Sequence, residues 1–307
     1  MRRRELLLAA AALGLPTWRP RPPRAATRLI LLGTAGGPRP KPGRNAAAQV
    51  ILVGDTPYLI DCGNGVARQL VLAGVPLRTL HHVFVTHHHS DHNADFGTLL
   101  LLAWSSGLAE PVDAWGPPPL AEITRLFLEM SRRDIEVRIA DEGRVPLAPL
   151  VRPHELAGPG PVYEDANVRV TSALVPHPMM TPAYAYRFDT ADRSIVISGD
   201  TAPSDAVVAL AHGADVLVHE AMYLPAVDRI VSGVGDANAT TLRRHLVDSH
   251  TSAEDAGRIA RRAGVGTLVL SHLIPSDDPA VTEAMWRAAA ESTFGGRVVV
   301  GRDLMEL

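Results

Sequence analysis

The stretch that decides the fold reads VFVTHHHSDHNAD and covers residues 83–95. It opens with a short apolar run, Val83–Thr86, that has the β-branched character of a buried strand. Directly after this run, four side chains follow the pattern H-x-H-x-D-H, and they are His87, His89, Asp91 and His92. Imidazole and carboxylate groups are ligand types for zinc. Because a tight loop after a strand can turn several side chains towards one point, the stretch predicts a metal site.

Three other histidines in this region are assigned no metal. His88 falls out of the alternating pattern, so its side chain is predicted to point away from the site. His81 and His82 stand at the start of the strand and are predicted to be surface residues. The loop is therefore expected to offer four ligands, which is too few for two complete metal sites.

The missing ligands are sought at the ends of other strands. Three more side chains of the right type each follow a predicted strand directly, and they are His177, Asp200 and His272. Each of these signals is weak by itself. Together with the first loop, they supply enough histidine and aspartate for two metal ions.

Short β-rich runs alternate with amphipathic segments along the rest of the chain. The predicted strands are 29–32, 49–53, 58–60, 83–86, 168–174, 183–188, 194–198, 216–218, 268–270 and 298–300. The predicted helices are 66–73, 96–104, 120–132, 203–212, 253–263 and 279–291. Proline-rich stretches, including 146–161, are predicted to be loops. This order favours two mixed sheets packed face to face with helices outside, an αβ/βα sandwich.

The motif and its three followers resemble the metallo-β-lactamase superfamily over nearly the whole chain after about residue 28. Within that superfamily, the chain is most similar to the branch that contains ribonuclease Z and the arylsulfatase-like hydrolases. The supporting segments are LLGTAGGP at 31–38, YLIDCGNG at 58–65, VHEA at 218–221 and SHTSAEDAGRIARRAGVGTLVLSHL at 249–273. The resemblance implies the metallo-β-lactamase fold and a metal-dependent hydrolase.

The resemblance also implies how the ligands are shared between two zinc ions, with manganese or iron as possible replacements. His87, His89 and His177 would hold the first ion. Asp91, His92 and His272 would hold the second. Asp200 would bridge the two ions.

Catalytic roles follow from the same resemblance. Asp91 would orient the attacking water as well as bind metal. In this branch, a histidine at the place of His250 assists departure of the leaving group, and a glutamate at the place of Glu220 supports that histidine. Asp61 is expected to orient a metal ligand. Cys62, the single cysteine, is expected to be a small buried residue.

The substrate is predicted to be a small anionic ester, either a sulfate ester, as in the arylsulfatase-like relatives, or a phosphodiester. Ribonuclease Z carries a long basic arm between the places of His177 and Asp200, whereas here only 23 positions separate them. The formal net charge is −3, and it becomes −8 without residues 1–26. No nucleic acid is therefore expected as a partner. A ribonuclease Z-like endoribonuclease and a non-catalytic metal-binding or ligand-binding relative remain as alternatives.

Two segments are expected to shape the pocket. Met179 and Met180 follow a ligand directly, and with Tyr223 they would form an apolar wall. Residues 223–246 are a candidate lid.

The first 26 residues resemble an export signal. Arg3-Arg4-Glu5-Leu6-Leu7 is similar to a twin-arginine motif, and the apolar run from Leu6 to Leu15 is too short to span a bilayer. The sequence thus predicts a signal peptide over 1–26, one hydrolase domain over 27–307 and a periplasmic location, or a cytoplasmic one if the segment is not a signal. No membrane partner is expected, and a homodimer is possible because the branch often forms dimers.

Overall fold

The computed structural model describes residues 26–233, 235 and 238–307. The strands of the first sheet are β1 (Thr27–Gly33), β2 (Ala48–Val53), β3 (Thr56–Ile60), β4 (His82–Phe84), β5 (Val112–Gly116), β6 (Val151–Glu155) and β14 (Met305–Glu306). Those of the second are β7 (Gly160–Glu164), β8 (Val168–Val175), β9 (Ala183–Thr190), β10 (Ser194–Ile197), β11 (Val216–Met222), β12 (Thr267–Ile274) and β13 (Arg297–Val300).

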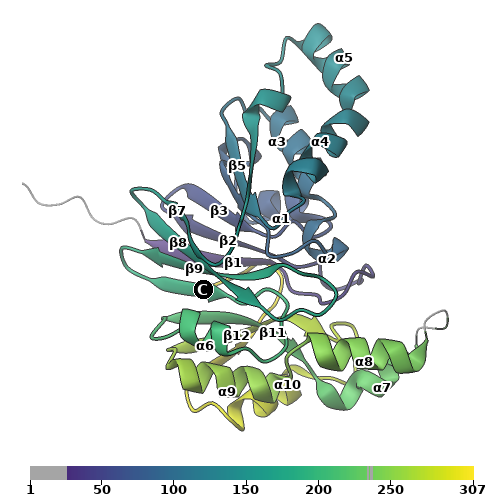
Figure 1. Cartoon of the computed structure of the whole chain (residues 1–307), viewed down its shortest axis with the longest axis vertical. Coiled ribbons are helices and arrows are strands. Elements are labelled where there is room, and N and C mark those ends of the chain that lie inside the picture. Colours follow the sequence, from purple (N-terminus) through teal and green to yellow (C-terminus); the bar gives the residue numbers. More distant parts are fainter. Residues whose placement is uncertain (1–25, 234, 236–237) are drawn as a thin grey trace, which may run out of the picture.

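Ten α-helices are assigned within the described residues. They are α1 (Val66–Leu72), α2 (Ser90–Asn93), α3 (Phe96–Ser105), α4 (Leu120–Met130), α5 (Arg132–Glu142), α6 (Asp205–Leu210), α7 (Val227–Ser232), α8 (Ala239–Ser249), α9 (Ala253–Ala263) and α10 (Glu283–Glu291). The sheet orders are β14-β1-β2-β3-β4-β5-β6 and β13-β12-β11-β10-β9-β8-β7. The two sheets lie together with helices outside them (Figure 1), so the predicted αβ/βα sandwich is confirmed.

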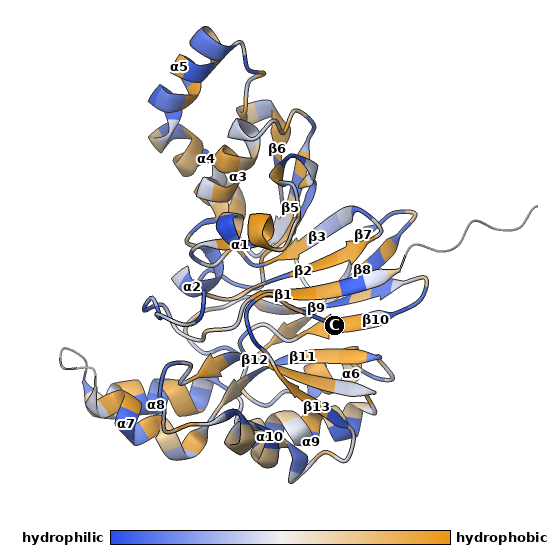
Figure 2. Cartoon of the chain, turned by 180° about the vertical axis from the view of Figure 1, so that it is seen from behind, coloured by the Kyte–Doolittle hydropathy of each residue, from blue (hydrophilic) through white to orange (hydrophobic). Residues whose placement is uncertain are grey.

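Three apolar layers hold this arrangement together. The layer between the sheets contains large buried side chains such as Tyr58, Phe84 and Phe188. A second layer joins the first sheet to α1 and α3, and a third joins the second sheet to α6, α9 and α10. Most strands are coloured as hydrophobic in Figure 2, as expected for sheets covered on both faces.

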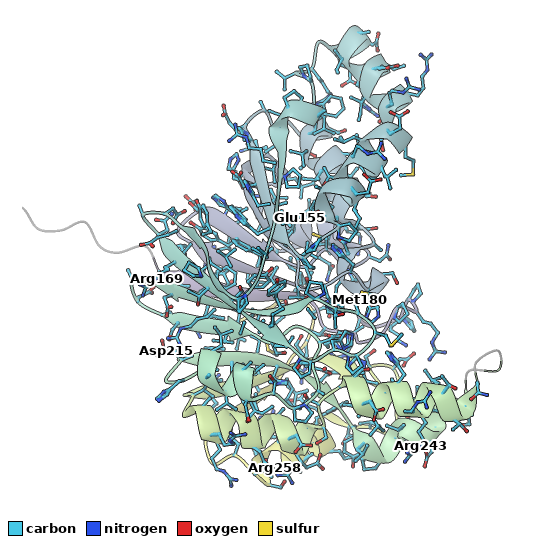
Figure 3. All side chains as sticks on the ribbon, in the orientation of Figure 1. Glu155, Arg169, Met180, Asp215, Arg243 and Arg258 are labelled. Atoms are coloured by element: carbon cyan, nitrogen blue, oxygen red, sulfur yellow. The ribbon has the colours of Figure 1, made fainter. Side chains whose placement is uncertain are left out.

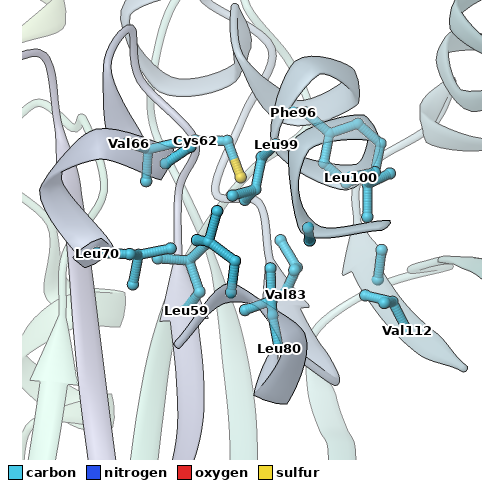
Figure 4. Close-up of a cluster of buried hydrophobic side chains, with 14 of the residues drawn as sticks. Leu59, Cys62, Val66, Leu70, Leu80, Val83, Phe96, Leu99, Leu100 and Val112 are labelled. Carbon is cyan, nitrogen blue, oxygen red and sulfur yellow. The ribbon is translucent and has the colours of Figure 1, made fainter. Parts of the chain in front are cut away.

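Cys62 belongs to the layer beneath α1 and α3, where it lies among aliphatic side chains (Figure 4). Its side chain is fully buried, and burial raises the pKa of the thiol well above its ordinary value. A thiol that stays protonated is a poor nucleophile. The prediction of a small buried residue is confirmed.

Helix α9 shows why the sequence folds as it does. Its buried face consists of Gly257 and an apolar stripe of Ala253, Ala256, Ile259, Ala260 and Ala263, which recur at helical spacing. The Ser252 hydroxyl caps its start by accepting a hydrogen bond from the Asp255 amide. The left-handed Gly264 ends it. The predicted helix at 253–263 is confirmed at both ends.

Several predicted elements need correction. The helix predicted over 120–132 breaks at Ser131, and α5 follows it as a second helix that buries none of its residues. The proline-rich stretch at 146–161, predicted as a loop, contains β6 and the start of β7. The candidate lid at 223–246 is not among these corrections: it includes α7 and most of α8, and its role as a lid stays a prediction.

Other predictions concern the N-terminal segment, the domain bounds and the membrane rather than single helices or strands. The predicted signal peptide lies almost wholly in residues 1–25, outside the described residues. Export and a single domain over 27–307 remain predictions. Among the described residues, the helices lack the length and apolar character needed to cross a bilayer.

Candidate metal centre and cleft

The predicted ligands converge because strands from both sheets end at the same place. Strand β4 leads into His87, and His89 is the residue before α2, which carries Asp91 and His92. From the second sheet, His177 follows β8, Asp200 follows β10 and His272 lies within β12. The structure therefore brings together all seven side chains that the sequence singled out.

The first group of ligand atoms comes from His87, His89, His177 and Asp200, and these atoms lie within 4.8 Å of one another. His89 Nδ1 is 3.1 Å from His87 Nε2 and 3.0 Å from His177 Nε2. Burial lowers the pKa of His87 well below its ordinary value and that of His177 to about 4. Both imidazoles are therefore neutral at physiological pH, which is the state that binds a metal.

The second group comes from Asp91, His92, Asp200 and His272, again within 4.8 Å. His272 Nε2 lies 3.1 Å from Asp91 Oδ2 and 3.2 Å from Asp200 Oδ2. Asp200 belongs to both groups, so its carboxylate is shared between them.

The donor set fits divalent metal ions. His92 Nε2 and Asp200 Oδ1 face each other at 3.2 Å, yet both are buried and neither makes a hydrogen bond with any described residue. Buried polar atoms normally have a partner. Two atoms that share no hydrogen bond but point at a common space are the pattern expected of metal ligands.

Asp61 orients one of these ligands. Its Oδ2 is 2.8 Å from His92 Nδ1, and its Oδ1 accepts a hydrogen bond from the Thr86 amide at 2.8 Å. Fixing Nδ1 leaves His92 Nε2 directed to the metal side. Asp61 has a φ of 62° and His272 a φ of 45°, both in the left-handed region that side chains avoid. Such backbone strain gathers where a site must hold a side chain in one direction.

Of the histidines next to the ligands, His88 lies as predicted and His82 does not. His88 points away, with its Nε2 2.8 Å from the Pro117 carbonyl oxygen. His82 is not a surface residue, because its ring stacks on Tyr58 at 5.0 Å and on Trp115 at 6.0 Å. It lies on the inner face of the first sheet, where the aromatic layer encloses it.

His250 and Glu220 form a buried pair beside Asp200. His250 Nδ1 lies 3.0 Å from Glu220 Oε2 and 3.9 Å from Asp200 Oδ2. Burial opposes the charged imidazole, but the Glu220 carboxylate outweighs it and raises the pKa of His250 to about 9. Glu220 also accepts a hydrogen bond from the Thr201 amide at 2.7 Å, which fixes the carboxylate.

The metal centre opens into a cleft of about 690 Å³. Ile230, Leu242, Leu246 and Ile274 give it an apolar wall. The predicted wall is wrong. Met179 is 96% exposed, and neither it nor Met180 (Figure 3) lines the cleft. Tyr223 packs on Trp286, with ring centroids 5.6 Å apart.

Four cleft residues escaped the sequence reasoning, namely Arg39, Lys41, Arg229 and His245. Lys41 Nζ lies 3.5 Å from Asp277, and Arg229 Nε lies 2.9 Å from Asp278. Lys41 is the only lysine in the sequence, which was a signal that could have drawn attention to it. His245 is five positions before His250, but only the packing of α8 shows that it reaches the cleft.

Comparisons with known proteins agree with this geometry. The family model described as "Beta-lactamase superfamily domain" matches residues 56–273. A protein of Mycobacterium bovis BCG named Ribonuclease Z is 36% identical over 279 residues, covering 90% of this chain and 96% of that protein.

Two solved structures share the fold. Human tRNase Z, short form, is 20% identical with a TM-score of 0.67, covering 91% of this chain and 98% of that one. The metallo-beta-lactamase fold protein YhfI of Bacillus subtilis is 23% identical with a TM-score of 0.67, covering 92% and 98%.

These relatives overturn the predicted substrate. A small anionic ester, the arylsulfatase-like activity and the exclusion of nucleic acid are contradicted by relatives named Ribonuclease Z. The error lay in using the net charge of the whole chain, which does not describe the groups that line the cleft. The broader prediction of a metal-dependent hydrolase with divalent metal ligands is confirmed. The chain belongs to the beta-lactamase superfamily and, within it, to the ribonuclease Z branch.

Proposed function

We propose that this chain is an endoribonuclease of the ribonuclease Z type, which hydrolyses a phosphodiester bond in a transfer-RNA precursor. The observation that carries the proposal is the 36% identity to Ribonuclease Z of Mycobacterium bovis BCG over nine-tenths of the chain. The fold shared with human tRNase Z is in keeping with it. The metal-ligand groups and the His250–Glu220 pair, which border one cleft, supply the chemistry that such a reaction needs.

We further propose that the site holds two zinc ions. His87, His89 and His177 would hold the first, and Asp91, His92 and His272 the second. The Asp200 carboxylate would contact both. Zinc bound there would polarise a phosphate oxygen and lower the pKa of a water to roughly 7, making a nucleophile available at neutral pH.

The protein's own groups direct the reaction. Asp91 orients the attacking water, and its Oδ2 is held by the Gly37 amide at 2.9 Å. The water oxygen bonds to phosphorus as one phosphorus–oxygen ester bond breaks. The departing ribose oxygen takes a proton from His250, a general-acid role. Glu220 holds His250 Nδ1 and so leaves Nε2 to face the leaving oxygen.

The cleft suits a polyanion despite the acidic chain. Arg39, Lys41 and Arg229 line it, although Lys41 pairs with Asp277 and Arg229 with Asp278. Metal ions bound at the ligand groups would supply the further positive charge that attracts a phosphate. The segment between His177 and Asp200 contains β9 and β10, which form a hairpin. The binding surface for the rest of the RNA therefore has to come from elements other than this segment.

The test uses the full-length, zinc-loaded protein and a transfer-RNA transcript that carries a 3′ trailer. We expect a single internal cut that separates the trailer, and we expect a chelator or Asp200→Asn to abolish it. The same transcript without its trailer is the matched control and should stay intact. Full metal loading without any cut would reject the proposed activity. Elemental analysis should give two zinc ions per chain, and a value of one would reject the two-ion site.

A further inference from the structure

His245 is a further imidazole in the cleft, in addition to those of the metal ligands and His250. Its ring centroid lies 6.3 Å from that of His89 and 5.9 Å from that of His250. It thus borders the space between a ligand of the first metal group and the candidate proton donor. Both ligand groups are complete without it, so its place in the cleft needs another explanation.

Helix α8 directs His245 into the cleft. Leu242, His245 and Leu246 all line it, and their spacing of three and four residues places them on one helix face. Leu246 is almost fully buried in a cluster with Met222 and Ile274, which fixes α8 against the body of the protein. The imidazole is therefore held on a packed element rather than on a loop.

The hydrogen bonding of His245 leaves one ring nitrogen free for a ligand. Its Nδ1 lies 3.4 Å from Ser249 Oγ. No described residue hydrogen-bonds the other nitrogen, Nε2. Apolar side chains flank the ring on its own helix, so His245 is the one hydrogen-bonding group that this face of α8 offers to the cleft.

We propose that His245 binds the substrate directly, through a hydrogen bond from Nε2 to a non-bridging oxygen of the phosphodiester being cleaved. The inference rests on the proposed function, because it takes a phosphodiester as the substrate. A diester that reaches the metal centre and presents its leaving oxygen to His250 must pass beside His245. Hydrogen bonds to charged groups are stronger than neutral ones, so this contact would orient the phosphate for attack.

The experiment compares His245→Ala, His245→Gln and Val247→Ala in the full-length, zinc-loaded protein. Val247 is on the same helix but is 37% exposed and does not line the cleft, so it controls for changes to α8 itself. Each variant is assayed on the trailer-bearing transcript and on bis(p-nitrophenyl) phosphate, and its zinc content is measured. Both substrates contain the diester that His245 would contact.

We expect His245→Ala to lower kcat/KM on both substrates by roughly tenfold to a hundredfold, the range for a hydrogen bond to a charged group. Zinc content should be unchanged, His245→Gln should recover part of the rate because its amide can donate, and Val247→Ala should match the wild type. A His245→Ala enzyme as active as Val247→Ala would overturn the inference. Loss of rate together with loss of zinc would also overturn it, because His245 would then act on the metal centre.

The outcomes separate this inference from the proposed function. A wild-type protein that hydrolyses the small diester but leaves the transcript intact would reject the ribonuclease activity. The effect of His245→Ala on the small diester would then decide the inference alone. A zinc-loaded wild type that hydrolyses neither substrate would overturn both.

Discussion

The contribution of His250 to the reaction rate depends on the leaving group of the substrate. Replacing it by alanine is expected to slow cleavage of the transcript by about 10²–10⁴-fold, because a ribose oxygen would depart without a proton. Bis(p-nitrophenyl) phosphate should be affected far less, since nitrophenolate is a stable anion. The two rates and the zinc content are measured on the same preparation. Equal losses on the two substrates would contradict the general-acid assignment.

Gly199, the residue before Asp200, leaves no space for a side chain. Its φ is +59°, and an added Cβ would lie 2.8 Å from the Tyr184 carbonyl oxygen and 3.0 Å from Thr86 Cβ. Gly199→Ala is therefore expected to displace Asp200 and to lower the zinc content below that of the wild type.

Gly213 provides the matched control for this substitution. It has a similar φ of +64°, but an added Cβ would meet nothing within 4 Å. Gly213→Ala should carry only the backbone cost, about 1–2 kcal/mol of unfolding free energy, and keep its metal. Equal zinc contents in the two variants, measured by elemental analysis, would show that the space around Gly199 does not position Asp200.

The ligands could be predicted because each lies near the end of a recognisable strand, and strand ends from two packed sheets meet at one edge. The outward direction of Met179 could not be predicted, because its φ of 70° turns the side chain into solvent, where it is 96% exposed. The place of His245 in the cleft could not be predicted either, because the direction of its side chain depends on how α8 packs over the cleft. Sequence adjacency to a ligand thus proved a poor guide to the pocket wall.

Among the secondary-structure elements, α5 contributes least to the core. It buries none of its residues, whereas α9 buries six. Ala140→Gly in α5 is expected to change the Tm little, because only partly buried side chains such as Ile135 and Ile139 join this helix to the core and it can open locally. Ala260→Gly in α9 should lower the unfolding free energy by about 1 kcal/mol or more, since propensity and packing are both lost. Thermal denaturation of the two variants checks this, and equal shifts would contradict it.

Strands β6 and β7 show why some elements were missed. Each contains a proline, Pro153 or Pro161, and each lies at the edge of its sheet. Proline cannot donate to a neighbouring strand, so it is tolerated at an edge but argues against a strand when only the sequence is read. Edge position is a property of the assembled sheet, which the local pattern does not contain.

At the scale of the whole molecule, Asp165 ties the two sheets together. Its Oδ2 accepts hydrogen bonds from Tyr58 on the first sheet at 2.7 Å and from Tyr163 on the second at 3.1 Å. Burial raises the pKa of this carboxyl, but the hydrogen bonds from Tyr58 and from backbone amides outweigh it, so the net pKa is lowered. The stabilisation is therefore present above the pKa of the unfolded chain, about 4, and is lost as the pH falls through the lower folded value.

Asp165→Asn tests this linkage. The variant is expected to be less stable than the wild type at pH 7 and to lose less stability between pH 5 and pH 3. Urea denaturation across that range measures the difference. Asp55→Asn, at an exposed turn in the first sheet, is the control and should follow the wild type. Parallel curves for the wild type and Asp165→Asn would contradict the assignment.

The fold class was predictable because the order of strands and helices is compatible with few layered arrangements of sheets and helices. The substrate was not, because it was judged from the summed charge of the chain. The net charge does not say where the charged groups lie, whereas an RNA strand responds to the local electrostatic field of the cleft. Arg39 and Lys41 share one segment, whereas Arg229 comes from a segment far along the sequence, so only the folded chain shows their common location.

Lys41 offers a single amine for covalent coupling in the cleft. It carries the only ε-amine of the chain, so the N-terminal amine is the sole other primary amine. Its side chain is 7% exposed and lies beside Asp277, which shields it from amine-reactive labels in bulk solvent. An RNA whose 3′ end has been oxidised to a dialdehyde would couple, after reduction, to whichever of these two amines it reaches. Peptide mapping of that single bond would record whether the 3′ end of the RNA reaches Lys41 in the cleft.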